Sequence, residues 1–293
     1  MGKFIFLVTI LASSASLAAA QQIDRDQIVA QLNKDGCVQL DERKVKFCRF
    51  DYVAGGSRVD AIAVYPLAEG KYPGLLLLPG FEGTARTLLT IGALFAQQGF
   101  ACLAVTPPGF GDSGGKRDFV GPASIDAFAV GFKNFARMSY VDAAKMGIFG
   151  YSRGGMAASL LAVKLGKDVR AAVFSSGVYD FKRAYLQTRF DGIRTNMKAE
   201  TGMTDDAIDE RSSILYMDKL KCPVLITHGA IDANVPVNQA YLLRDRLIEL
   251  KKDFEFKILP DHVHGQLKVD FLSLVLDFLS RKLRGTPATF KLS

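Results

Sequence analysis

The chain has 293 residues, of which 49% are hydrophobic and 23% charged, and its formal net charge is +7 at pH 7. This hydrophobic fraction is enough for a sizeable core and excludes a disordered chain. The positive charge does not indicate nucleic-acid binding, because Lys and Arg are spread along the chain and mixed with Asp and Glu. The composition therefore predicts a globular protein without a nucleic-acid partner.

The first twenty residues have the pattern of a secretory signal peptide. A short basic region at Lys3 precedes an apolar run from Phe4 to Leu11, and the small residues Ala18 to Ala20 have the pattern of a cleavage site. We expect cleavage after Ala20 and a secreted or periplasmic protein with no remaining membrane span. The alternative is an uncleaved N-terminal anchor, although this apolar run is too short to span a bilayer stably.

The four cysteines fall into two kinds. Cys37 and Cys48 lie in a segment ahead of the main sheet pattern, where an exported chain could join them by a disulfide. Cys102 and Cys222 lie in apolar strands, and we expect them to be buried small hydrophobic residues. No cysteine spacing resembles a zinc site, so no metal is expected.

The mature chain predicts an α/β fold. A helix over residues 21–34 belongs to an N-terminal segment, 21–49, and the alternating pattern on either side of Gly55-Gly56 predicts an antiparallel hairpin over 46–65. Short buried strands and helices then alternate, which is typical of a doubly wound, mostly parallel sheet with functional loops at the carboxyl ends of its strands. The expected strands are 72–78, 101–105, 146–149, 171–174, 223–227 and 254–259, and the expected helices are 84–98, 123–138, 156–165, 237–250 and 269–283.

The main domain is expected to span residues 50–283, followed by a tail over 284–293. Between residues 177 and 219 the regular pattern loosens, with charged and aromatic residues mixed. We expect this segment to form a partial lid near the pocket. Tyr151, Tyr179 and Phe181 are the candidate substrate contacts.

Ser152 is the candidate nucleophile. It stands at the centre of Gly150-Tyr151-Ser152-Arg153-Gly154, between an apolar strand and a helix. The glycines are needed because neighbouring backbone passes close to the serine, and the turn exposes the hydroxyl at a helix N-terminus. A bare G-x-S-x-G occurs by chance, but the flanking strand and helix predict a nucleophile elbow.

A serine nucleophile needs a base, and the base needs a carboxylate to hold its tautomer. His264, in the loop after the last strand, is favoured as the base over its neighbour His262, whereas His228 is expected to be structural. Asp232 follows the strand over 223–227 and is favoured as the orienting carboxylate over Asp261. The resulting chain order is Ser, Asp, His.

Two backbone N–H groups are candidates for an oxyanion hole. One belongs to Arg153, directly after the nucleophile. The other comes from the loop after the strand over 72–78, where Phe81 is favoured over Glu82. The pattern G-x-G-x-x-G over 109–114 does not predict a nucleotide site, because a loop rather than a helix follows it. No organic cofactor is expected.

These motifs resemble the α/β-hydrolase superfamily, in particular the prolyl oligopeptidase and dienelactone hydrolase-like branch. The resemblance covers residues 50 to 283 and rests on three stretches: 141–155 with the elbow, 223–236 with Thr-His-Gly-Ala-Ile-Asp, and His264-Gly265. It implies that Ser152 is the nucleophile, Asp232 the acid and His264 the base. One departure is Pro79-Gly80, where many relatives have His-Gly.

Peptidases of this branch commonly carry a large N-terminal propeller, which the roughly fifty residues before the sheet cannot form. We therefore expect an exported, carboxylesterase-like serine hydrolase that acts on a small-molecule ester or related acyl bond. The alternatives are a small oligopeptidase or amidase acting on short peptides, and a catalytically silent hydrolase-fold binding protein.

Overall fold

The computed structural model describes residues 23–266 and 268–288. The predicted signal peptide and the last five residues of the predicted tail lie outside this range. Within it, no helix combines the length and the apolar character needed to cross a membrane.

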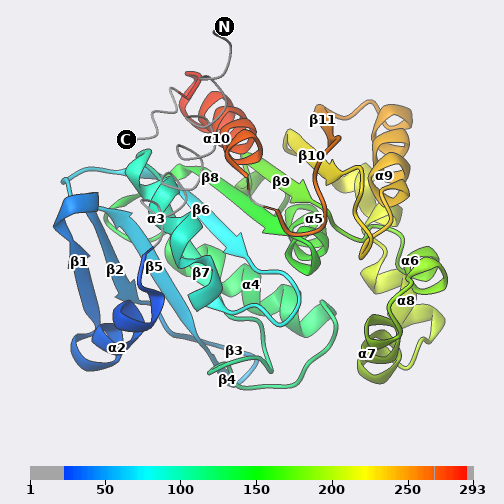
Figure 1. Ribbon diagram of the computed structural model, residues 1–293, viewed down its shortest axis with the longest axis horizontal. Helices are drawn as coiled ribbons and strands as arrows, with labels where there is room; N and C mark the ends of the chain where they lie inside the picture. The colour runs from blue at the N-terminus through cyan, green and yellow to red at the C-terminus, as the bar shows by residue number, and fades with distance from the viewer. Residues whose placement is uncertain (1–22, 267, 289–293) are drawn as a thin grey trace, which may run out of the picture.

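A nine-stranded sheet forms the centre of the molecule (Figure 1). The first three strands in its order are antiparallel to their neighbours, and all pairs from β7 onward are parallel. The expected α/β fold with a mostly parallel sheet is thus confirmed. In spatial order the strands are β1 (Cys37–Leu40), β2 (Val45–Arg49), β5 (Ala61–Pro66), β7 (Ala101–Val105), β6 (Tyr72–Leu78), β8 (Val141–Tyr151), β9 (Ala171–Ser175), β10 (Val224–Gly229) and β11 (Phe254–Leu259).

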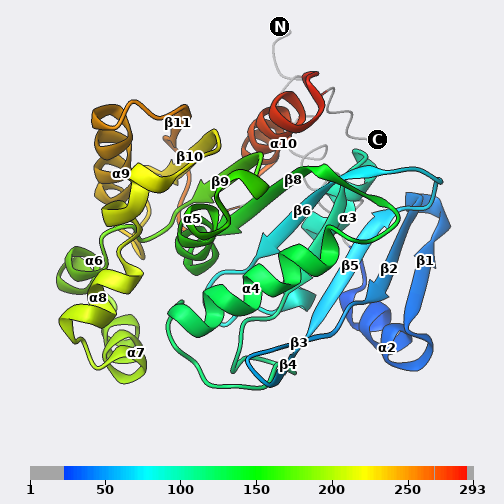
Figure 2. The same cartoon turned by 180° about the vertical axis from the view of Figure 1, so that it is seen from behind.

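Helices cover both faces of this sheet, as Figures 1 and 2 show from opposite sides. Strands such as β7 are apolar throughout because both of their faces are buried. The side chains divide into two cores, one on each side of the sheet. One core contains α2 (Arg25–Asp35), α3 (Leu89–Gln97) and α10 (Val269–Arg284), and the other contains α4 (Pro122–Phe135), α5 (Arg153–Leu165) and α9 (Asn238–Glu249).

The predicted hairpin is present but divided. Its tip is a separate ribbon of β3 (Tyr52–Ala54) and β4 (Ser57–Val59), while β2 and β5 pair within the main sheet. Gly55 and Gly56 join β3 to β4 with φ of 56° and 77°, the left-handed backbone that a tight two-residue hairpin turn requires.

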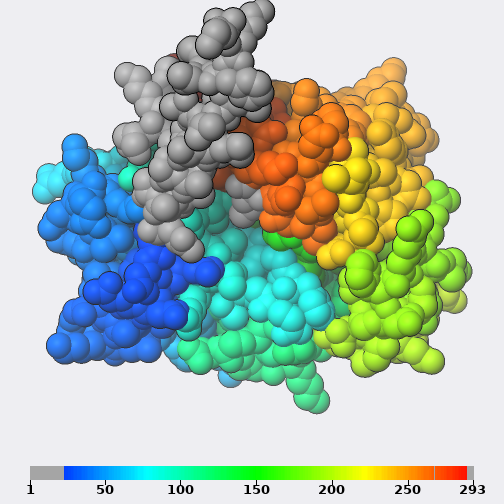
Figure 3. Space-filling model, viewed as in Figure 1, coloured from blue at the N-terminus to red at the C-terminus, as the bar shows by residue number. Residues whose placement is uncertain are grey.

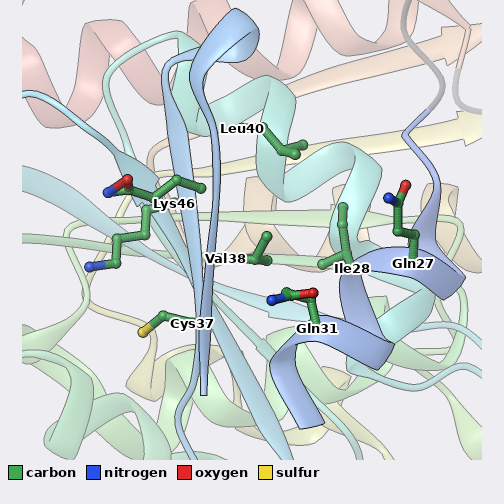
Figure 4. Close-up of a pocket in the computed structure, with 8 residues that line it drawn as sticks. Gln27, Ile28, Gln31, Cys37, Val38, Leu40 and Lys46 are labelled. Atoms are coloured by element: carbon green, nitrogen blue, oxygen red, sulfur yellow. The ribbon is translucent and has the colours of Figure 1, made fainter. Parts of the chain in front are cut away.

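Strand β1 lies at one edge of the sheet, where the sequence predicted no strand. Cys37 faces Cys48 across the β1–β2 pair, and a disulfide joins them. Figure 4 shows the groove of about 520 Å³ that lies between α2 and this edge, with Ile28, Val38 and Leu40 among its lining residues. In strand order β1 is five positions from β8, so this groove is remote from Ser152.

The segment over 177–219 is mostly helical. It contains α6 (Phe181–Gln187), α7 (Asp191–Thr201), α8 (Asp205–Arg211) and a 3-10 helix, η4 (Ser213–Lys219). In the space-filling view this segment forms one end of the molecule, opposite the end made by α2 and β1 (Figure 3). It connects β9 to β10, so it begins at the carboxyl ends of the parallel strands, where the candidate site residues also lie.

Candidate active site

Ser152 lies in a sharp turn between β8 and α5. Its φ of 56° is unusual for a residue with a side chain, and its N–H donates to the Ser175 carbonyl at 2.8 Å. Glycine is required at two neighbouring positions. A Cβ on Gly150 would stand 1.9 Å from the Gly154 carbonyl oxygen, and one on Gly154 would stand 2.0 Å from the Leu78 carbonyl oxygen.

The structure brings the three predicted residues together at the carboxyl ends of their strands. Ser152 follows β8, Asp232 follows β10 and His264 follows β11. Ser152 Oγ is 2.8 Å from His264 Nε2, and His264 Nδ1 is 2.6 Å from Asp232 Oδ2. With Nδ1–H donating to the carboxylate, Nε2 is left as the acceptor for the serine hydroxyl.

The Asp232 side chain is fully buried, with 0% exposure. Its Oδ1 accepts hydrogen bonds from the N–H groups of Asn234 and Val235, both at 2.9 Å. Burial alone would raise the pKa of Asp232, but the hydrogen bonds from His228, His264 and Val235 hold it well below its usual range. The carboxylate therefore stays ionised beside His264.

His228 supports this carboxylate from the other side. Its Nε2 lies 3.3 Å from Asp232 Oδ2 and donates a hydrogen bond to the Val235 carbonyl at 2.9 Å. The side chain is fully buried. The sequence indicated a structural histidine here, and its contact with the carboxylate appears only in the structure.

The alternative base, His262, and the alternative acid, Asp261, have hydrogen-bond partners outside the candidate site. His262 Nε2 is 3.0 Å from Asp270 Oδ2, in a pair at the start of α10. Asp261 is exposed, and its backbone carbonyl accepts a hydrogen bond from Lys268. Neither residue contacts Ser152 or His264 through any hydrogen bond in the described part of the chain.

The turn after β6 lies against the serine. A Cβ placed on Gly80 would stand 3.4 Å from Ser152 Cβ and 3.0 Å from the Tyr151 ring, so a side chain here would fit tightly against the serine turn. Phe81 follows with 38% of its surface exposed, and the rival Glu82 has a φ of 57° and a carboxylate paired with Arg117 at 3.1 Å. Arg153 is the first residue of α5, so its N–H has no partner inside the helix.

The three predicted substrate contacts differ in burial. Tyr151 is half-buried, and its ring centre is 5.5 Å from that of His264. Burial, with the nearby Asp232 carboxylate, raises the pKa of Tyr151 to about 12, so its hydroxyl stays neutral. Tyr179 and Phe181 have 0% exposure and lie in the apolar core, so the prediction that they contact substrate is wrong.

The sequence did not predict a role for the Arg153 side chain. It is 8% exposed, and its Cζ is 3.9 Å from the centre of the Phe110 ring and 6.0 Å from that of Phe81. Burial lowers the pKa of Arg153 to about 10, which leaves it charged at neutral pH. The sequence did contain a signal for such a role. Arg153 directly follows the nucleophile in the first turn of a helix, where the helix dipole disfavours a positive charge.

A strained turn lies close to Arg153. Phe119 and Val120 both have positive φ, 44° and 62°. Glu200 of α7 accepts a hydrogen bond from the Phe119 N–H at 2.8 Å, and Arg211 of α8 donates to the Asp118 carbonyl at 2.6 and 3.1 Å. The segment over 177–219 therefore holds this turn in place.

Among residues 23–266 and 268–288, no group of three or more His, Cys, Asp or Glu side chains is arranged to hold a metal ion. Ser152, His264 and Asp232 can carry out nucleophilic and acid–base chemistry, because they form one chain of hydrogen bonds.

Comparison with known proteins places this arrangement in context. The sequence pattern of the prolyl oligopeptidase family matches residues 90–286. The uncharacterized peptidase YtmA of Bacillus subtilis (strain 168) is 33% identical over 211 residues, which cover 70% of this chain and 80% of YtmA.

Two solved structures share the fold at low identity. The acylaminoacyl peptidase of Pyrococcus horikoshii has a TM-score of 0.70 at 17% identity, covering 85% of this chain and 43% of the peptidase. The acetyl xylan esterase from Paenibacillus sp. R4 has a TM-score of 0.69 at 17% identity, covering 88% of this chain and 93% of the esterase. The chain thus spans less than half of the peptidase and nearly all of the esterase.

Proposed function

Because the chain belongs to the prolyl oligopeptidase family and is a serine hydrolase of the esterase or peptidase type, we propose that it is an exported esterase that uses Ser152 as nucleophile. The observation that carries this proposal is the continuous chain of hydrogen bonds from Ser152 Oγ through His264 to Asp232, at 2.8 and 2.6 Å. The substrate class is a small carboxylic ester or a related activated acyl bond.

In the proposed reaction His264 Nε2 accepts the proton of the Ser152 hydroxyl while Oγ attacks the substrate carbonyl carbon. Asp232 holds the imidazole in its Nδ1–H tautomer and stabilises the imidazolium that forms. His264 then gives the proton to the leaving alcohol, and the C–O bond breaks to leave an acyl-enzyme. Water, deprotonated by His264, attacks the acyl carbon, and the returning proton regenerates the Ser152 hydroxyl.

The carbonyl oxygen becomes negatively charged in both steps, and backbone donors aimed at it stabilise the transition state. We assign this role to the N–H groups of Arg153 and Phe81. Two observations support the assignment: the N–H of Arg153 is free at the start of α5, and Gly80 brings the Phe81 turn against Ser152. The N-terminus of α5 adds a favourable dipole at this point.

The similarity to an acetyl xylan esterase, over 88% of this chain and 93% of the esterase, supports an ester as the substrate. Peptide hydrolysis is the second candidate, and it is favoured by the family itself and by the similarity to YtmA. The segment over 177–219 is proposed to form a partial lid, since Glu200 and Arg211 connect it to the turn beside Arg153.

Export is proposed from the signal-peptide pattern in residues 1–20, with cleavage after Ala20. The disulfide between Cys37 and Cys48 supports it, because disulfides persist mainly in oxidising compartments outside the cytosol. The proposed location is the periplasm or the extracellular medium.

A fluorophosphonate probe tests the proposed function on the purified mature protein. Labelling should occur in the wild type and disappear in Ser152→Ala, and hydrolysis of a short p-nitrophenyl ester should fall about 10⁴- to 10⁶-fold in Ser152→Ala and His264→Ala. Ser159→Ala and His262→Ala are matched controls, because these residues bond to Ser213 and Asp270 instead. A wild type that takes no label and hydrolyses no ester would instead support a silent binding protein.

A further inference from the structure

Arg153 carries a buried positive charge that forms no salt bridge within the described part of the chain. Its Nη2 is inaccessible to solvent and has no hydrogen-bond partner in the described part of the chain. Three carboxylates act on its charge, but all are engaged elsewhere: Glu82 pairs with Arg117 at 3.1 Å, Glu200 accepts the Phe119 N–H, and Asp118 accepts from the N–H and hydroxyl of Ser124. A buried charged donor without an acceptor is costly, so the guanidinium lacks a partner that would stabilise it.

Three features of the position disfavour a cation. The side chain is desolvated, it stands in the first turn of α5 where the helix dipole is positive, and the charge of Arg117 lies nearby. Contact with the Phe110 and Phe81 rings compensates only in part, because an aromatic face attracts a cation without accepting its N–H groups as a carboxylate does. An anion from outside the chain would satisfy both the charge and the donors.

The guanidinium lies on the side of Ser152 where the turn after β6 is found. Phe81 belongs to this turn, and Gly80 brings the turn against Ser152. Arg153 also lines a small, partly open cavity of about 10 Å³, together with Pro79, Pro107 and other residues. That volume holds about one water molecule, which could accept one hydrogen bond but could not neutralise the charge.

We infer that Arg153 binds a carboxylate of the substrate, so that the enzyme prefers acyl substrates that carry a negative charge close to the scissile bond. The inference rests on the proposed function and narrows its substrate class. A guanidinium suits this role because its planar set of N–H donors can bind both oxygens of one carboxylate. The carboxylate could belong to the acyl group or to the leaving group, and the two cases need different substrates.

Two pairs of esters separate these cases. On the acyl side, 4-nitrophenyl hemiglutarate is compared with neutral 4-nitrophenyl hexanoate, after subtraction of the enzyme-free rate. On the leaving-group side, 4-acetoxybenzoate is compared with 4-acetoxybenzamide. In one pair, the ratio of kcat/KM for the charged over the neutral ester should fall roughly 10- to 100-fold in Arg153→Gln.

Two further variants sharpen the result. Arg153→Lys keeps the charge but loses the planar donor set, so its ratio should lie between those of wild type and Arg153→Gln. If Arg153→Gln does not fold, the ratio measured for Arg153→Lys tests the inference in its place. Arg183→Gln is the control, since this arginine is 48% exposed and pairs with Asp180 at 3.8 Å. Its ratio should change by less than about threefold. Equal ratios in wild type and both Arg153 variants, for both pairs, would overturn the inference while leaving the proposed function intact.

Binding provides a readout that does not depend on turnover. Glutarate monomethyl ester and 4-acetoxybenzoate are titrated by calorimetry into Ser152→Ala, and into the same protein carrying Arg153→Gln or Arg153→Lys. Binding that weakens roughly 10-fold or more with Arg153→Gln supports the inference even if no ester is hydrolysed and the proposed function fails. Absent binding, or binding equal with and without the guanidinium, overturns it.

Discussion

The site contains two buried charged groups, and their surroundings are opposite. On one side of Ser152, the Asp232 carboxylate receives hydrogen bonds from two backbone N–H groups and from His264, with His228 at 3.3 Å. On the other side, the Arg153 guanidinium has a buried Nη2 with no acceptor in the described residues. The carboxylate therefore has its hydrogen-bond donors without substrate, whereas the guanidinium lacks an acceptor for Nη2.

In the proposed mechanism, this difference separates the group that supports catalysis from the group that recognises substrate. Groups that must be correctly oriented in every turnover benefit from fixed partners, because the protein then need not reorganise as charge develops. A group that selects substrates gains from lacking a partner, since its interaction free energy is then realised only when the correct ligand binds. The predictions below change the charge of Asp232, then its neighbour His228, and then its protonation state, to test whether the catalytic side requires this fully hydrogen-bonded carboxylate.

The largest effect is expected from Asp232→Asn. The amide preserves the shape of the side chain but removes the charge that stabilises the imidazolium and fixes its tautomer. We expect kcat to fall about 10⁴-fold, measured with a p-nitrophenyl ester under saturation. Asp261→Asn, three residues from His264 but exposed, should have little effect. Comparable losses in the two variants would contradict the assigned carboxylate.

A smaller effect is expected from His228→Phe, which removes a donor near Asp232 while keeping an aromatic ring of similar size. We expect kcat to fall roughly 10- to 100-fold with KM little changed, because the carboxylate still contacts His264 but is less firmly held. His228→Gln should recover part of the loss, since its amide can donate. If kcat stays at the wild-type value and only the melting temperature falls, His228 is structural and does not position Asp232.

The smallest effect concerns acid stability. The pKa of Asp232 is depressed in the folded protein, so its ionised form stabilises the fold fully above the unfolded value of about 3.9, and this contribution is lost as pH falls through the folded value. The difference in unfolding free energy between wild type and Asp232→Asn should therefore shrink between about pH 5 and about pH 3. Urea titrations measure it, and a difference that stays constant to about pH 3 would contradict a depressed pKa.

Much of the sheet could be predicted because its strands are apolar runs bounded by turns. The strand over 254–259 matches its predicted bounds, and the hairpin turn follows from two consecutive glycines. Strand β1 could not be predicted, since four residues of mixed burial have no clear period. Likewise α7 buries only Met197, which is too weak a pattern to indicate a helix.

For the site, chain order and strand ends were sufficient to select Ser152, Asp232 and His264 as neighbours. Chain order and strand ends do not indicate which side chains are buried. The sequence favours Tyr179 and Phe181 because they are aromatic residues in an irregular segment, but an aromatic residue in a core and one in a pocket look alike in sequence. The position of the Arg153 guanidinium depends on Phe110, which lies more than forty residues away in the chain.

For the proposed lid, the strained turn at Phe119 and Val120 affects how easily the segment over 177–219 can move away from the site. Each positive φ costs about 1–3 kcal/mol, and a β-branched valine is especially disfavoured there. The contacts that maintain it come from Glu200 and Arg211, in the helices over 177–219. When these helices separate from the turn, the backbone can relax, and the relaxation offsets part of the hydrogen bonding that is lost. Opening of the proposed lid would therefore require less free energy than the broken contacts alone suggest, which would favour rapid exchange of substrate and product.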